Sequence, residues 1–305
     1  MKNAIVGLLI LVLPAATFAQ TKPAKPDEPY TLSVNVDLVL FNVTVLDKGG
    51  HLVPGLEQNN FRIYEDGKPQ EIRLFNPEDI PASVGLVIDN SGSMASKIPD
   101  VIAAATAFLR ESNPLDELFI VNFADRVSFG LPEGMPFTND SSQVERALSS
   151  IHATGRTALY DGVAAALSHL RQGSRQKKAL VVLSDGGDNA SHIGLKDVIG
   201  SAEQSSATIY TIGIYDENDR DRNPKILRQL AKLSGGESYI PRGTNQLAAI
   251  WRRIAGGIRS QYTVGYVSTN PARDGTFRNV KIDVMDRRGK PLQVRTRKGY
   301  LAPRQ

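Results

Sequence analysis

The sequence contains no cysteine among its 305 residues. This absence excludes disulfide bonds, thiolate metal sites and a lipid-modified cysteine. Histidine and tryptophan are scarce, with 4 and 1 residues, and the histidines show no spacing typical of metal ligands. A packed apolar core must therefore stabilise the fold, and a hydrophobic content of 41% is sufficient for one.

The chain also lacks a strong excess of either charge and a long apolar segment. It has 36 basic and 32 acidic residues, and the net charge of +4 is spread along the sequence. Such a weak balance argues against nucleic acid as a partner. No segment after the N-terminal region is long and apolar enough for a membrane helix, so we expect no membrane span in the mature chain.

The first residues have the composition of an export signal. Lys2 supplies a positive charge, residues 5–13 form a short apolar run, and Thr17-Phe18-Ala19 ends in a small residue suited to cleavage near Ala19. We therefore expect a signal peptide over residues 1–19 and a proline-containing linker over residues 20–30. The mature protein is then periplasmic or secreted. An uncleaved membrane anchor is the alternative.

Two stretches that flank the middle of the chain alternate apolar and polar residues with period two, which predicts strands. They cover residues 31–80 and 261–305. In the first, Asp66-Gly67 predicts a hairpin turn between residues 61–64 and 72–75. Neither flank has enough strands to bury a core alone, so we expect the two to pair into one β-sandwich. Two separate sheets are the alternative.

The pattern changes to strands alternating with amphipathic helices over residues 81–260. The expected strands are 84–88, 118–123, 179–183, 208–214 and 238–240. The expected helices are 97–111, 142–151, 159–171, 195–204, 224–233 and 247–258. Apolar strands separated by amphipathic helices predict a mostly parallel sheet with helices on both faces, which is a doubly wound α/β fold.

Three polar loops lie where this fold binds ligands, beyond the carboxyl ends of its strands. Asp89-Asn90-Ser91-Gly92-Ser93 follows the first expected strand, and Ser184-Asp185-Gly186-Gly187-Asp188-Asn189 follows the third. Residues 154–162 lead into a helix. Their carboxylates and hydroxyls form an all-oxygen set that suits a hard divalent cation. Taken alone, the first loop is more typical of a polar loop that caps a helix.

The segments DNSGSM, TGRTALYDG and LSDGGDN resemble the three loops of the metal-ion-dependent adhesion site in von Willebrand factor type A domains. The resemblance covers about residues 81 to 260, and the flanks resemble an exported bacterial subgroup that contains such a domain. It implies that Ser91 and Ser93 ligate the metal directly and that Thr157 does so in one loop state. Asp89 and Asp185 would ligate directly or through water.

Arg156 departs from this family, whose members often have glycine at that position. Because Arg156 adjoins a ligand and replaces none, we expect it to affect the choice of partner rather than to abolish metal binding.

The resemblance implies Mg²⁺, with Mn²⁺ or Ca²⁺ as other candidates, and a protein partner. A physical reason supports it: three neutral hydroxyls leave the charge of the cation poorly compensated, so an Asp or Glu carboxylate of the partner is a favourable further ligand. We expect a metal-dependent adhesion or protein-binding module without enzyme activity. The alternatives are a scaffold whose metal stabilises the loops, and a metal-dependent hydrolase, for which no residue is placed as a general base.

Overall fold

The computed structural model describes residues 37–215 and 222–304. The expected signal peptide, the linker and the first residues of the N-terminal flank lie outside this part of the chain. None of the helices within it combines the length and the apolar character needed to cross a membrane.

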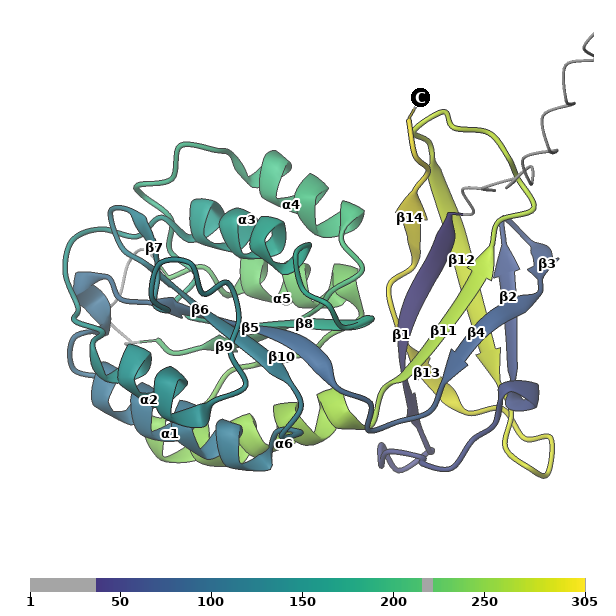
Figure 1. The fold of residues 1–305 in the computed structure, drawn as a ribbon, viewed down its shortest axis with the longest axis horizontal. Coiled ribbons are helices and arrows are strands. Elements are labelled where there is room, and N and C mark those ends of the chain that lie inside the picture. The colour runs from purple at the N-terminus through teal and green to yellow at the C-terminus, as the bar shows by residue number, and fades with distance from the viewer. Residues whose placement is uncertain (1–36, 216–221, 305) are drawn as a thin grey trace, which may run out of the picture. The chain divides into compact units, whose positions relative to one another are not determined.

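A six-stranded sheet forms the centre of residues 82–259, in the order β10-β9-β8-β5-β6-β7 (Figure 1). Its strands are β5 (Ala82–Asp89), β6 (Glu117–Phe123), β7 (Val127–Phe129), β8 (Lys177–Ser184), β9 (Thr208–Gly213) and β10 (Ser238–Tyr239). β7 runs antiparallel to β6, and the other neighbours are parallel. Every residue of β5 is buried, as in a parallel strand that is covered on both faces.

Helices cover both faces of this sheet. They are α1 (Ile98–Glu111), α2 (Ser141–Ser149), α3 (Leu159–Leu170), α4 (Leu195–Gln204), α5 (Pro224–Ser234) and α6 (Leu247–Arg259). Figure 1 shows α1, α2 and α6 along one face and α3, α4 and α5 along the other. In α1, the buried Val101, Ala105 and Phe108 recur every three or four residues, which places one apolar stripe against the sheet. The doubly wound α/β fold is confirmed.

Two antiparallel sheets are built from strands on both sides of this α/β segment. Their orders are β13-β1-β11-β4 and β14-β12-β2-β3. The strands are β1 (Leu38–Leu46), β2 (Phe61–Glu65), β3 (Lys68–Gln70), β4 (Ile72–Asn76), β11 (Tyr262–Val267), β12 (Phe277–Val284), β13 (Gln293–Arg295) and β14 (Gly299–Leu301). β1 pairs with β11, and β2 pairs with β12. Phe41, Phe61, Tyr262 and Ile282 from the two sheets share one core, so the flanks form a sandwich rather than separate sheets.

One strand pairing differs from the expectation. The turn at Asp66-Gly67, with φ angles of 46° and 80°, joins β2 to β3. The predicted partner, β4, instead pairs with β11 in the other sheet. The chain leaves the first sheet after the short β3, and Ile72 and Phe75 of β4 then cover the core from the opposite side. The hairpin turn is confirmed, whereas the prediction that residues 72–75 form its second strand was wrong.

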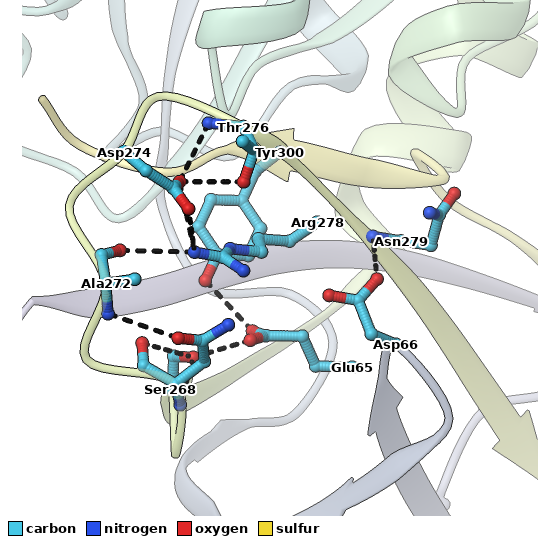
Figure 2. Close-up of polar contacts among 10 residues, drawn as sticks. Glu65, Asp66, Ser268, Ala272, Asp274, Thr276, Arg278, Asn279 and Tyr300 are labelled. Carbon is cyan, nitrogen blue, oxygen red and sulfur yellow. Dashed lines mark hydrogen bonds and ion pairs between the residues drawn. The ribbon is translucent and has the colours of Figure 1, made fainter.

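Figure 2 shows a buried carboxylate in the sandwich that the sequence pattern did not reveal. Glu65, the last residue of β2, is buried. It accepts hydrogen bonds from the hydroxyls of Tyr266 (2.7 Å), Tyr300 (2.9 Å) and Ser268 (2.6 Å). Burial raises the pKa of Tyr300 to about 12, so this hydroxyl stays a donor at neutral pH. The three bonds replace the water that the carboxylate loses, and they tie β2 to β11 and β14.

Candidate metal centre

The first and third predicted loops leave neighbouring strands of the central sheet. β5 and β8 are parallel, with Ile88 beside Leu183, so Asp89 and Ser184 end these strands side by side. On the other side of β5, the backbone N–H of Asn90 donates to the carbonyl of Phe123 in β6 at 3.0 Å. The strand register therefore brings together two loops that are about a hundred residues apart in the sequence.

Asp89 has no exposed surface and is held by two hydrogen bonds. Its Oδ1 accepts from the backbone N–H of Ser91 at 2.9 Å, and its Oδ2 accepts from the hydroxyl of Ser184 at 2.6 Å. Burial raises the pKa of Asp89 to about 6, and the nearby charge of Asp185 adds to the rise. A buried carboxylate in this situation gains free energy when a cation is placed against it.

A chain of side-chain hydrogen bonds joins the first loop to the third. The Oγ atoms of Ser91 and Ser93 are 3.1 Å apart, and the hydroxyl of Ser93 donates to Oδ2 of Asp185 at 2.8 Å. Adjacent oxygen ligands of an octahedral Mg²⁺ lie about 3.0 Å apart, because each bond is about 2.1 Å long and neighbouring bonds meet at a right angle. The Ser91–Ser93 and Ser93–Asp185 distances are therefore compatible with neighbouring ligands of one small cation. Ser93 is exposed, so this edge is open to a partner.

The second loop is attached to both of the others through its backbone. The N–H of Gly92 donates to the carbonyl of Gly155 at 3.0 Å. The N–H of Thr157 donates to the side chain of Asn189 at 2.9 Å, and the carbonyl of Thr157 accepts from the N–H of Asn189 at 2.9 Å. Thr157 is buried. The structure thus brings Thr157 to the same edge by backbone bonds, whereas the side chains of Ser91, Ser93 and Asp185 meet directly.

Two glycines allow these loops to approach closely. Gly155 has a φ of +67°, and a Cβ there would lie 1.8 Å from Oδ2 of Asp125. Gly186 has a φ of +80°, and a Cβ there would lie 2.5 Å from the carbonyl oxygen of Asn223. A side chain at either position would strain the backbone and displace a neighbour. Glycine in the second and third loops is therefore a requirement of this geometry.

Three polar residues that support the site were not among those predicted. Ser184 donates to Asp89 and accepts from the N–H of Gly186 at 3.0 Å. Asn189 fixes Thr157. Oδ2 of Asp188 accepts from the backbone N–H of Tyr160 at 2.9 Å, in the first turn of α3. All three lie in the LSDGGDN segment, so their place in the motif was the signal available.

Arg156 lies beside the predicted ligands and makes an ion pair with Asp125 at 3.0 Å. Its Nη1 also donates to the carbonyl of Asn189 at 3.4 Å. Hydrogen bonding to Arg156 holds the pKa of Asp125 below its usual value. Both side chains are largely exposed. Arg156 is thus an accessible positive charge, held in place at the edge that carries the candidate ligands.

The donor set fits a hard cation and excludes a soft one. Among residues 37–215 and 222–304, no group of three or more His, Cys, Asp or Glu side chains is placed to hold a metal. The candidate set contains only two carboxylates, Asp89 and Asp185, and its other members are the hydroxyls of Ser91, Ser93 and Thr157. Oxygen donors of this kind suit Mg²⁺, Mn²⁺ or Ca²⁺ rather than zinc or copper.

The chain is similar to known proteins mainly over its α/β segment. Residues 84–187 match the family model of the von Willebrand factor type A domain. A curated protein of Borreliella burgdorferi, described as an uncharacterized protein, is 33% identical over 102 residues, which make up 32% of this chain. The match spans only 29% of the length of that relative.

Two solved structures extend the comparison. A von Willebrand factor type A protein from Catenulispora acidiphila aligns over 88% of this chain and 74% of its own, with 16% identity and a TM-score of 0.54. The von Willebrand factor domain of the type V pili tip protein Mfa5 from Porphyromonas gingivalis aligns over 59% of this chain and 95% of its own, with 15% identity and a TM-score of 0.50. Identity this low shows a shared fold alone. Residues 84–187 therefore match the von Willebrand factor type A domain family, and the two solved structures share the fold of this chain.

Proposed function

We propose that this chain is an exported protein-binding module that holds a Mg²⁺-type cation and uses it to capture an Asp or Glu carboxylate of a partner protein. The ligands are Asp89, Ser91, Ser93, Thr157 and Asp185. The observation that carries the proposal is the convergence of Ser91, Ser93 and Asp185 at octahedral ligand spacing. The fold shared with the domain of a pili tip protein is consistent with adhesion.

The bound cation supplies an electrophilic centre with a coordination position for a partner's oxygen. The residues of the chain set how strongly it attracts that oxygen. Ser91, Ser93 and Thr157 contribute neutral oxygens, so only Asp89 and Asp185 offset the charge of a divalent ion. Asp89 already accepts bonds from Ser91 and Ser184, which spread its negative charge. An open coordination position on the ion would therefore still favour a partner carboxylate, most strongly where Asp89 or Asp185 acts through water.

The first test is metal binding by the Ser93→Ala variant, measured by titration calorimetry with Mg²⁺. Removing one direct ligand weakens binding by about tenfold or more. Ser149→Ala is the matched control, because Ser149 is exposed on α2 and donates only to the carbonyl of Glu145. Equal Mg²⁺ affinity in wild type and Ser93→Ala would sink the proposed ligand set.

The second test is capture of partners from exported proteins, with Mg²⁺ and with a chelator, by the wild-type chain and by Asp89→Ala. Capture that is lost with the chelator and with the variant supports the module. If chelation lowers the melting temperature and leaves capture unchanged, the metal is a scaffold element. Mg²⁺-dependent turnover of simple esters or phosphates would instead favour the hydrolase.

Export is tested by the intact mass of the mature protein, which begins at Gln20 if cleavage follows Ala19.

A further inference from the structure

Arg297 is a buried cation in the segment between β13 and β14. Its Nη1 donates to the carbonyl of Ser205 at 3.0 Å and its Nη2 to the carbonyl of Leu40 at 2.7 Å. The guanidinium lies over the ring of Phe41, 4.5 Å from the centroid. Burial lowers the pKa of Arg297 to about 10, so the group remains charged at neutral pH. Two carbonyls and one aromatic ring orient this charge without neutralising it.

Within the described part of the chain, no carboxylate forms an ion pair with Arg297, and its Nε has no hydrogen-bond partner. Buried charges in proteins are normally paired, because an isolated one carries a large desolvation cost. The arrangement therefore lacks an anion. Arg297 also lines a cavity, which gives such an anion a place to bind.

The cavity has a volume of about 250 Å³ and lies among α4, α5, β12 and the start of β14. Lys232 and Lys298 line it together with Arg297, and among the described residues Glu203 is the only carboxylate in its wall. Three positive charges against one negative charge give the wall an excess of +2. The electrostatic complement is an anion.

The remaining wall is mostly apolar. Ala202 and Leu233 contribute aliphatic surface from α4 and α5, and Phe277 contributes an aromatic ring from β12. Phe277 is 41% exposed, so part of its ring is accessible to a ligand. A cavity volume of about 250 Å³ is enough for a molecule of about ten non-hydrogen atoms.

We propose that this cavity binds a small organic carboxylate that carries a short apolar chain. The carboxylate compensates the charges of Arg297, Lys232 and Lys298, and the apolar chain packs against Leu233 and Phe277. This site is separate from the candidate metal centre and does not depend on the metal. Because its walls come from the α/β segment and from the sandwich, the ligand stabilises both parts when it binds.

The test uses the full mature chain and octanoate, which has a carboxylate, an apolar chain and ten non-hydrogen atoms. We expect one molecule per chain with a dissociation constant of about 1 mM or tighter, measured by titration calorimetry. Acetate tests the need for the apolar chain, and octylamine tests the need for negative charge. Both should bind at least about tenfold more weakly than octanoate. A chelator should leave octanoate binding unchanged.

Charge reversal identifies the site. The double variant Lys232→Glu with Lys298→Glu should weaken octanoate binding by at least about tenfold, because both lysines are exposed at the cavity and become repulsive. Lys225→Glu is the matched control, since Lys225 is exposed on the same helix α5 and lies outside the cavity wall. Arg297 is not substituted, because its hydrogen bonds to the carbonyls of Leu40 and Ser205 contribute to the fold. The proposal fails if octanoate does not bind, if octylamine binds equally well, or if the double variant binds like wild type.

Discussion

At the scale of single residues, two buried carboxylates of this chain are compensated in different ways. Glu65 accepts three hydroxyl bonds, whereas Asp89 accepts one hydroxyl and one backbone N–H and also faces the charge of Asp185. Both are buried. The difference predicts that Glu65 stabilises the sandwich by itself, while Asp89 depends on a bound cation.

The pKa of Asp89 predicts that Mg²⁺ binding depends on pH. Because the folded pKa of about 6 lies above the usual aspartate value of 3.8, the metal-free folded state holds an extra proton between these values. Its stability therefore falls as the pH rises through that window. Mg²⁺ needs the ionised form, so its affinity falls on acidification, by about tenfold between pH 7 and pH 5. Calorimetric titrations at both pH values measure this, and equal affinities would contradict it.

The Glu65 cluster predicts a graded loss of stability. Tyr300→Phe removes one hydroxyl and should lower the free energy of unfolding by about 1 kcal/mol. Glu65→Ala leaves the hydroxyls of Tyr266, Tyr300 and Ser268 without their acceptor, and should cost about 3 kcal/mol. Urea unfolding followed by circular dichroism compares the two variants. A Glu65→Ala protein as stable as Tyr300→Phe would show that water replaces the carboxylate.

The sequence was sufficient to locate the candidate ligands, but not the residues that orient them. Asp89, Ser91 and Ser93 lie in one short segment, and the three-loop pattern adds Thr157 and Asp185. The contact between Ser184 and Asp89 depends on the register of β5 against β8, which local sequence does not specify. The roles of the five candidate residues as metal ligands stay predictions.

At the scale of secondary-structure elements, long amphipathic segments were predictable, and so was the short edge strand β10, whereas the short edge strands β3 and β7 were not. α4 begins and ends at the predicted residues 195 and 204. β7 was missed because it has only three residues, none of them buried, so it has no periodic pattern. β3 was missed because it is equally short and contains Pro69. Its absence from the prediction led directly to the wrong partner for β2.

The start of α3 yields a prediction that separates capping from metal binding. Asp188 accepts from the N–H of Tyr160 in the first helical turn, and from the hydroxyl of Ser191. We expect Asp188→Ala to lower the free energy of unfolding by about 1 kcal/mol, as the loss of a helix cap does. Mg²⁺ affinity should stay within about threefold of wild type. A variant of unchanged stability that no longer binds Mg²⁺ would make Asp188 a ligand.

At the scale of the whole molecule, the α/β segment has the geometry of an insertion into the sandwich. The chain enters the segment after β4 and leaves it just before β11. These two strands pair, with Asn76 beside Thr263. The N–H of Asp79 donates to the carbonyl of Arg259 at 2.6 Å, so the two ends of the segment lie next to each other. Adjacent ends allow a segment to fold as an independent unit within a host domain.

The two flanks, in contrast, depend on each other. Each sheet of the sandwich contains strands from both flanks, so a single flank would leave its paired strand edges and its half of the core exposed to water. We therefore predict that residues 82–260 fold alone and bind Mg²⁺, whereas residues 31–80 and residues 261–305 do not fold as separate chains. Circular dichroism of each piece measures this, and residues 82–260 carrying Ser93→Ala serve as the control for metal binding. A random-coil spectrum for residues 82–260 would show that contacts with the flanks, such as that of Gln261 with Thr208, are required for folding, and would contradict the insertion.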